Sequence, residues 1–245
     1  MNFYSVIIGT ELLNGRRCDA HFAFLNNELL KRGWEQKASF VIKDEPPFIE
    51  DIFRLVQNDP DGVMFCFGGI GSTPDDYTRQ CAANVFTNGK MEQNKLVEKC
   101  IIDQFGDDAY PYRINMAYLP VNAKQLKNVV NNVPGFSLKG KYFFTPGFPT
   151  MAHSMVVEAL DTFYPKNKEK FRYFLKAQCS ENDLIDIMKL MPDKIDFSSL
   201  PQIKDDKRSV VISVGSYDKE EAKYFFGLFE EQLKQKNIPF ILEDS

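Results

Sequence analysis

The chain has 245 residues, of which 44% are hydrophobic and 26% charged, so it can bury a sizeable core as one large domain or two smaller ones. Its net charge of −4 at pH 7 argues against a general nucleic-acid binder or a protein that binds anionic membranes. No apolar run approaches the length of a membrane span and the first residues lack the basic segment of a signal peptide, so we expect a cytoplasmic protein with no membrane partner.

Buried strands alternate with amphipathic helices over the first third of the chain, which is typical of a mostly parallel sheet with helices on both faces. Short apolar runs predict the strands. Apolar residues at helical spacing predict the helices, with Pro46 and Pro47 in a first turn and Gly33 after a last one. We expect strands over residues 3–8, 35–42 and 62–67 and helices over residues 20–32, 46–56 and 76–86.

The middle of the chain continues this domain, and a polar, lysine-rich segment then separates it from a second pattern. We expect a helix within residues 91–112, strands over 116–119, 124–130 and 141–145, a closing helix over 151–163 and a linker over 164–170. In the second pattern we expect strands over 171–178, 195–199, 209–214 and 239–242 and helices over 181–190 and 218–236. The predicted fold is α/β: a doubly wound, mostly parallel sheet in three αβα layers (residues 1–163), followed by a small α+β sandwich (residues 171–245).

The stretch from Gly68 to Arg79 carries the strongest sign of chemistry. It reads Gly-Gly-Ile-Gly-Ser-Thr-Pro-Asp-Asp-Tyr-Thr-Arg and lies between a buried strand and a predicted helix. Glycines let the backbone approach an oxyanion, and the unpaired N–H groups of a helix start favour negative charge. We therefore predict a phosphate-binding turn at Gly68, Gly69, Gly71, Ser72 and Thr73. The alternative is structural, since such turns mostly serve backbone geometry and these polar residues are ordinary helix caps.

Charged residues beside this turn predict a divalent metal. Asp75 and Asp76 would repel a bare phosphate, and Mg²⁺ or another divalent cation between carboxylates and phosphate removes that repulsion. The alternative role of Asp76 is to cap the helix that it begins. Arg79 is a candidate phosphate ligand, or an ion-pair partner of Asp75 one helical turn away.

A second glycine motif, Gly-Thr-Glu-Leu-Leu-Asn-Gly, follows the first strand at residues 9–15. Ligands of such sheets bind at the carboxyl ends of the strands, so the two motifs predict one cleft. We assign Gly9, Thr10 and Asp19 to ligand binding. Glu11 either binds ligand hydroxyls or metal-bound water, or caps the turn after the strand; Asp19 in its alternative role anchors the start of a helix.

Together these segments resemble the molybdopterin-binding domain family, whose members carry G-D-E-L-L-x-G and G-G-[LI]-G-P-T-x-D-D-x-T-R. The chain is most similar to the N-terminal part of the competence/damage-inducible protein A (CinA) family. Residues 117–120 and 128–136 look like that family's N-P-x-G-x-A-P-G loop, and residues 146–149 look like its L-P-G-x-P loop. The resemblance implies further ligand contacts from Pro134, Gly135, Pro146 and Gly147.

This resemblance can be followed to about residue 160, with some departures from the family's pattern. This chain has Thr10 where the family has Asp, and Ser72 where the family has Pro. It has Ala20-His21 in place of Thr-Asn, and Asn131-Asn132 in place of a Gly-Thr pair. The last change puts side chains where backbone would approach a ligand closely.

The second domain looks like the KH-related domain of the CinA family. It has no G-x-x-G loop, which clamps nucleic-acid backbone in KH modules, so we expect no nucleic-acid partner. We expect a packing or dimerisation role, and hence a homo-oligomer. Longer family members continue into an amidohydrolase domain, whose activity we expect this chain to lack.

Two functions from different classes follow. Family relatives hydrolyse the pyrophosphate of ADP-ribose with a divalent metal, which implies catalytic roles for Asp75, Asp76 and Glu11, with the two aspartates as metal ligands. The second function is binding of molybdopterin or a phosphorylated nucleotide without turnover, linked to molybdenum cofactor metabolism. Thr10 and the Asn131-Asn132 pair favour binding, and the intact aspartate pair favours hydrolysis. Adenylyl transfer onto molybdopterin, by resemblance to more distant relatives, ranks third.

Overall fold

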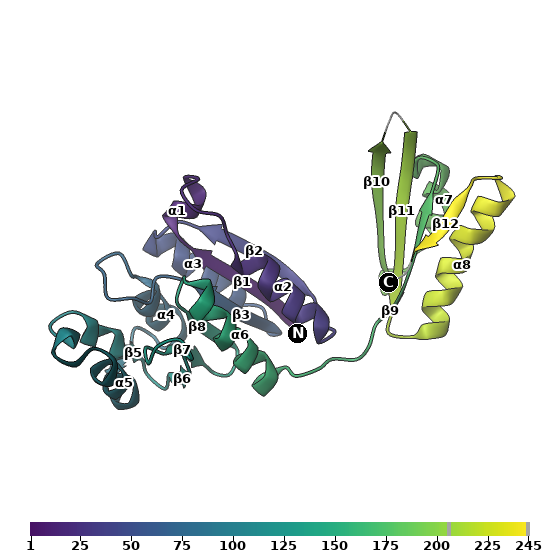
Figure 1. Cartoon of the computed structure of the whole chain (residues 1–245). Helices are drawn as coiled ribbons and strands as arrows, with labels where there is room; N and C mark the ends of the chain where they lie inside the picture. Colours follow the sequence, from purple (N-terminus) through teal and green to yellow (C-terminus); the bar gives the residue numbers. More distant parts are fainter. Residues whose placement is uncertain (205–206, 244–245) are drawn as a thin grey trace. The chain divides into compact units, whose positions relative to one another are not determined.

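The computed structural model describes residues 1–204 and 207–243, and residues 205–206 and 244–245 of the predicted second domain lie outside them. The chain separates into two units, Met1–Asn167 and Lys168–Ser245, which are drawn in Figure 1 and described separately below. Within the described ranges, no helix is both long and apolar enough to span a membrane.

A six-stranded sheet forms the middle of the first unit, in the order β2-β1-β3-β8-β7-β6. Four neighbouring strands run parallel: β2 (Gln36–Ile42), β1 (Asn2–Ile8), β3 (Gly62–Phe67) and β8 (Tyr142–Thr145). Two antiparallel strands, β7 (Gly135–Leu138) and β6 (Lys124–Leu126), complete it. Every residue of β3 is buried, as its unbroken apolar sequence predicts for a strand covered on both faces.

Helices cover both faces of this sheet, which confirms the predicted three-layer α/β fold (Figure 1). One face packs against α2 (His21–Lys31) and α6 (Pro149–Phe163). The other packs against α3 (Pro46–Gln57), α4 (Thr78–Phe86) and α5 (Lys95–Phe105). Side chains alternate along β1, with Phe3 and Ile7 in the first core and Tyr4, Val6 and Ile8 in the second.

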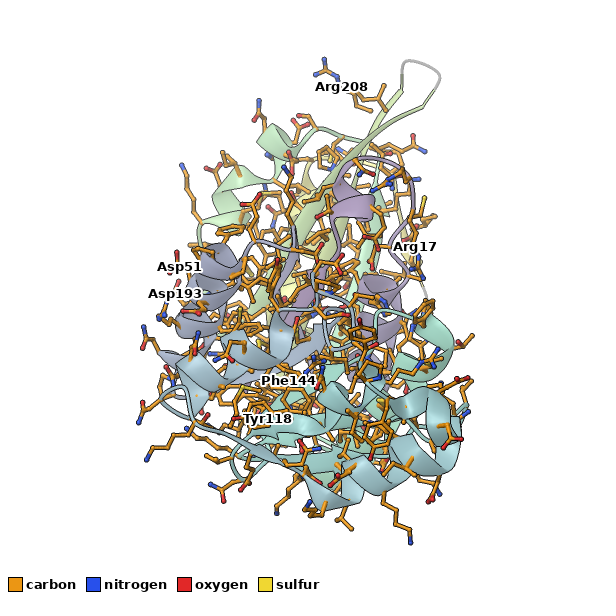
Figure 2. All side chains as sticks on the ribbon, turned by 90° about the vertical axis from the view of Figure 1, so that its left-hand side faces the viewer. Arg17, Asp51, Tyr118, Phe144, Asp193 and Arg208 are labelled. Carbon is orange, nitrogen blue, oxygen red and sulfur yellow. The ribbon has the colours of Figure 1, made fainter. Side chains whose placement is uncertain are left out.

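Aromatic rings fill the second of these cores. Phe144, labelled in Figure 2, is fully buried on β8 and stacks against Phe136 with ring centroids 4.5 Å apart. It also meets Phe53 and Phe86. Such pairs stabilise the core beyond their buried area by about 0.5–1.5 kcal/mol each.

The remaining elements of this unit lie around the sheet and differ in part from the prediction. They are α1 (Thr10–Leu13), the paired β4 (Met91–Gln93) and β5 (Tyr118–Pro120), and two 3₁₀ turns, η1 (Gly106–Ala109) and η2 (Arg113–Ala117). The strand predicted over 124–130 ends at Leu126, and β7 was not predicted. The physical reason is Asn128, whose side chain accepts from the N–H of Val130 and donates to the carbonyl of Val133, so that it closes a loop.

The second unit is a four-stranded antiparallel sheet in the order β10-β11-β9-β12, with helices interposed in the sequence. Its elements are β9 (Phe171–Ala177), η3 (Glu181–Asp183), α7 (Ile185–Met188), β10 (Asp196–Lys204), β11 (Lys207–Ser216), α8 (Lys219–Gln235) and β12 (Phe240–Glu243). Phe226, Phe229 and Leu233 of α8 share a core with buried residues of β9 and β11. This confirms the predicted α+β domain.

One helix of the second unit is shorter than predicted. Residues 181–190 form only a 3₁₀ turn and a single α-helical turn. The carbonyl of Asp183 accepts hydrogen bonds from the side chains of Gln232 and Lys236, at 2.8 and 2.6 Å. In a continuous helix the N–H of Ile187 would donate to Asp183, but it donates to the carbonyl of Leu184 instead, so the helix does not pass through Asp183.

The first unit extends past residue 163, into the predicted linker. Tyr164 is buried against Phe3 and donates its hydroxyl to the carbonyl of Gly140 at 3.0 Å. Asn167 donates its side-chain amide to the carbonyl of Gly33 at 3.0 Å. The connecting segment therefore begins after Asn167.

We expect a fragment of residues 1–167 to fold alone and keep full ligand affinity, because its core is complete without the second unit. A fragment of residues 1–163 lacks Tyr164, and removal of a buried aromatic side chain costs about 3 kcal/mol or more. Urea unfolding of both fragments measures the difference. A well-folded 1–167 fragment without affinity for ligands that the full chain binds would contradict this division.

Candidate functional site

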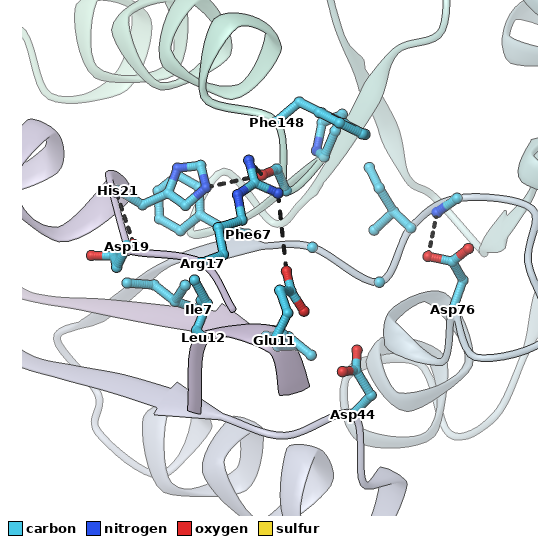
Figure 3. A pocket seen from close by; sticks show the side chains of 18 of the residues that line it. Ile7, Glu11, Leu12, Arg17, Asp19, His21, Asp44, Phe67, Asp76 and Phe148 are labelled. Carbon is cyan, nitrogen blue, oxygen red and sulfur yellow. Dashed lines mark hydrogen bonds and ion pairs between the residues drawn. The ribbon is translucent and has the colours of Figure 1, made fainter. Parts of the chain in front are cut away.

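Loops at the carboxyl ends of β1, β3 and β8 enclose a cavity of about 520 Å³, as predicted from the two glycine motifs (Figure 3). The structure brings many of the predicted residues together there: Gly9, Glu11, Asp19, Gly68, Gly69, Gly71, Ser72, Thr73, Asp75, Asp76, Pro146 and Gly147. Ile7, Leu12, Phe67 and Phe148 add apolar wall. The cavity is large enough for a small phosphorylated molecule.

The turn after β3 requires its first two glycines. Gly68 and Gly69 have φ of 98° and 68°. A Cβ would lie 2.4 Å from the carbonyl oxygen of Ile8 at Gly68, and 2.2 Å from Oγ1 of Thr78 at Gly69. Thr78 stabilises this turn through two hydrogen bonds. Its hydroxyl donates to the carbonyl of Gly68 at 2.9 Å, and its backbone N–H donates to the carbonyl of Gly69.

Asp76 organises the next part of the loop, and it does not begin a helix, because α4 starts at Thr78. Its Oδ1 accepts the N–H of Gly71 at 2.9 Å, and its Oδ2 accepts the N–H of Thr73 at 2.8 Å. The hydroxyl of Thr73 donates to the same Oδ2. Asp76 therefore folds the loop around its carboxylate, as Figure 3 shows for one of these bonds.

Arg79 supports the loop from beneath, and it does not line the cavity. Its Nη1 donates to the carbonyls of Ile70 and Gly71. Burial lowers the pKa of the Arg79 guanidinium, and the nearby charge of Asp76 opposes that shift. Backbone carbonyls hold this side chain, and no ion pair with Asp75 is formed among the described residues. The predicted phosphate contact of Arg79 stays a prediction.

These contacts leave backbone N–H groups of the loop for a ligand. Within residues 1–204 and 207–243, no hydrogen bond takes the N–H of Gly69, Ile70 or Ser72, or the hydroxyl of Ser72. Successive free N–H groups in a turn form an anion-binding concavity. The loop is thus held in shape by Thr78, Asp76 and Arg79, with its donors unused.

The charged side chains that line the cavity are mostly acidic. Among the described residues that line it, Arg17 is the one lysine or arginine, against the carboxylates of Glu11, Asp19, Asp44, Asp75 and Asp76. Arg17 lies 4.0 Å from Glu11, donates to the carbonyl of Gly147 at 3.4 Å and sits 5.8 Å from the ring centroid of Phe148. These are loose contacts of a half-exposed side chain, so Arg17 is free to turn toward an anionic ligand.

Asp19, like Asp76, accepts hydrogen bonds from neighbouring backbone N–H groups. Asp19 accepts the N–H groups of His21 and Phe22 at 2.9 and 3.0 Å and so caps α2, the alternative role expected for it. Asp75 is exposed.

Asp75 and Asp76, the predicted metal ligands, both line the cavity. Both oxygens of Asp76 accept hydrogen bonds from the loop. In the described part of the chain, no three His, Cys, Asp or Glu side chains are placed to enclose a metal ion. Mg²⁺ at phosphate sites is held by one or two carboxylates together with the phosphates. Metal binding by Asp75 and Asp76, directly or through water, stays a prediction.

Three other predicted residues lie outside the cavity. Thr10 donates its N–H and its hydroxyl to Asp44, at 2.9 and 2.8 Å, and so ties the ends of β1 and β2 together. Pro134 and Gly135 are buried where β7 begins. A Cβ at Gly135 would lie 2.4 Å from the carbonyl oxygen of Phe144, so this glycine serves strand packing.

Sequence reasoning missed Arg17 and Asp44. Asp44 follows β2, and the rule that places sites at strand ends would have found it. Arg17 lies in a loop with no pattern of its own. His21 is buried against Phe67 with ring centroids 4.4 Å apart, and its Nε2 lies 3.3 Å from the carbonyl oxygen of Gly147. Burial lowers the pKa of His21, which favours the neutral ring.

The part of the chain that forms this cavity is similar to a known protein family. A family model described as "Probable molybdopterin binding domain" matches residues 5–166. The chain belongs to this family. The match covers the loops that form the cavity and ends at the last residues of the first unit, so the second unit lies outside it.

The CinA-type resemblance is confirmed as well. A CinA-like protein of Fusobacterium nucleatum is 27% identical over 172 residues, 69% of this chain and 42% of that protein. A protein of Caldivirga maquilingensis is 32% identical over 180 residues, 71% of this chain and 68% of that protein. The crystal structure of CinA from Thermoplasma acidophilum, described as of unknown function, aligns with a TM-score of 0.59 at 27% identity, over 66% of this chain and 96% of that one.

Proposed function

We propose that the chain binds a phosphorylated pterin or nucleotide in this cavity, with a phosphate on the N–H groups of Gly69, Ile70 and Ser72. The observation that carries the proposal is this set of free donors in a loop that three other side chains hold in place. Preorganised donors need no rearrangement when an anion arrives, so they bind it more tightly than a flexible loop would. The molybdopterin in the family's description is such a ligand, a pterin that carries a phosphate.

Arg17 supports a ligand with more than one negative group. It lines the same cavity as the loop and makes only weak contacts with Glu11 and Gly147. A guanidinium binds phosphate oxygens through two parallel N–H groups. We assign it to a second phosphate or another anionic group of the ligand.

Hydrolysis of a pyrophosphate is the second candidate function. The carboxylates that line the cavity favour it. They would repel a phosphate bound to the loop, and a divalent cation between the carboxylates and the phosphate would remove that repulsion. The chain's own residues would bind and orient the phosphates through the loop and Arg17. Bound Mg²⁺ would supply charge neutralisation.

Thermal unfolding with candidate ligands tests the proposal. ADP-ribose, ADP and inorganic pyrophosphate are compared with and without Mg²⁺. A ligand present at 100 times its Kd stabilises the folded chain by about 2.7 kcal/mol. Stabilisation without turnover supports binding alone, whereas Mg²⁺-dependent release of AMP from ADP-ribose supports hydrolysis. No stabilisation by any phosphorylated pterin or nucleotide would overturn the proposal.

Arg17→Met and Arg16→Met form a matched pair of variants for this test. Arg16 lies next to Arg17 but outside the cavity, where it contacts Asn14. Loss of one charge-assisted hydrogen bond near the surface weakens binding by about tenfold. We expect this loss for pyrophosphate with Arg17→Met and no change with Arg16→Met. Equal losses in both variants would indicate a general effect of net charge.

A further inference from the structure

A second, smaller cavity adjoins the phosphate loop. Its volume is about 230 Å³, and it shares the wall residues Ile70, Gly71, Ser72, Pro146 and Phe148 with the main cavity. Because both cavities are built on the same loop, a ligand phosphate on the loop's N–H groups lies beside the smaller cavity.

The smaller cavity is mostly apolar. Phe105, Met116, Val133 and Met151 supply most of its remaining wall. Flat apolar walls and thioether sulfurs suit an aromatic ring. Among the described residues that line it, none has a carboxylate, so the polar groups here differ from those of the main cavity.

Asn131 presents a free donor to this cavity. Its Oδ1 accepts from the backbone N–H of Val133 at 3.0 Å and from Nδ2 of Asn128 at 2.7 Å. The N–H of Val133 can only donate, which fixes the amide with its oxygen toward the loop. Nδ2 of Asn131 then lies 3.8 Å from the sulfur of Met151, which is a weak acceptor. Its hydrogen-bonding capacity is therefore largely unused.

Arg113 is the second donor, and it is held in place. Its guanidinium lies 4.6 Å from the ring centroid of Phe105, and its Nη1 donates to the carbonyl of Asp108 at 2.8 Å. A planar guanidinium fixed in this way offers a surface for stacking and further N–H groups for hydrogen bonds. Donors without carboxylate acceptors recognise the acceptor edge of a ring, such as ring nitrogens or a carbonyl.

We propose that the smaller cavity binds the planar nitrogen heterocycle of the phosphorylated ligand, and that Asn131 reads an acceptor on the edge of that ring. This rests on the proposed function, because the phosphate on the loop brings the ring to this cavity. The proposal gives Asn131 a role that a glycine at this position does not have. The ring class is a purine or pterin that turns its acceptor edge toward Asn131 and Arg113.

Asn131→Asp removes the side-chain donor proposed to bind the ring and keeps the acceptor that holds the loop. The aspartate keeps an acceptor for Val133 and Asn128 but has no N–H to donate, and its charge repels a ring acceptor. Asn132→Asp is the matched control, since it adds the same charge at the neighbouring exposed residue, which lines neither cavity. Isothermal titration of the full chain with ADP and with inorganic pyrophosphate measures ring and phosphate contributions separately.

In the unmodified protein we expect ADP to bind more tightly than pyrophosphate. Asn131→Asp should weaken ADP by about tenfold relative to Asn132→Asp, the value of one lost hydrogen bond, with equal pyrophosphate affinity in both variants. The same titrations with a phosphorylated pterin show whether Asn131→Asp weakens binding of a pterin or of a purine. Equal losses for both variants, or ADP no tighter than pyrophosphate, would overturn the ring site while the phosphate site stands. Binding of none of these ligands would overturn both.

Discussion

Asp76→Asn is expected to weaken phosphate binding by about 30-fold, with a smaller effect on the fold. The carboxylate accepts the N–H groups of Gly71 and Thr73 and so sets the shape of the loop. An asparagine replaces one acceptor oxygen by an NH₂ group that points at an N–H donor. Loss of a hydrogen bond to a charged acceptor costs about 2 kcal/mol, which corresponds to about 30-fold in affinity. Titration with pyrophosphate in the absence of metal measures this loss.

The same variant distinguishes two roles of Asp76. The sequence alone predicts a metal ligand, whose removal suppresses Mg²⁺-dependent turnover and spares metal-free binding. The structure assigns the carboxylate to the loop, so the metal-free affinity should fall. Unchanged pyrophosphate affinity together with lost Mg²⁺-dependent turnover would contradict the structural assignment and restore the metal role.

Gly68→Ala is expected to destabilise the chain by about 4 kcal/mol and to abolish binding, since strain and overpacking each cost about 1–3 kcal/mol. The residue has φ of 98°, and an added Cβ would lie 2.4 Å from the carbonyl oxygen of Ile8. That oxygen belongs to the last residue of β1, which pairs with Ile42 of β2, so it cannot move away without disturbing this pairing.

Gly15→Ala is the matched control for this substitution. Gly15 also has positive φ, 79°, but an added Cβ there meets no atom within 4 Å. Only the conformational cost remains, about 1 kcal/mol. Chemical unfolding of both variants separates backbone strain from steric overlap. Equal destabilisation in the two variants would show that the approach of Ile8 to Gly68 is not the cause.

The architecture of the first unit followed from the sequence because its signals are local. The fully apolar β3 and the helices with Pro46 or Gly33 at their ends specify buried strands and amphipathic helices without information from elsewhere. The segment after residue 124 was harder to predict. The side chain of Asn128 closes a loop there, and β7 acquires its place only by pairing with β6 and β8. Such long-range pairing leaves little trace in a short sequence window.

The position of the site was predictable, but the roles of its charged residues were not. Strand ends and glycines locate the cavity because both are properties of the backbone. The direction of a side chain depends on its neighbours in space. Arg79 turns under the loop to two carbonyls, and Asp76 turns inward to two N–H groups. Neither direction can be obtained from the spacing of residues in the Asp-Asp-x-x-Arg pattern.

The most direct test of the account is an NMR titration of the ¹⁵N-labelled chain with inorganic pyrophosphate. A hydrogen bond to an anion shifts the amide proton of its donor downfield. The expected result is that the amides of Gly69, Ile70 and Ser72 show the largest downfield shifts and saturate together, while the amide of Gly71, already bound to Asp76, shifts little. Saturable shifts confined to another surface, with these three amides unmoved, would contradict the proposed phosphate site.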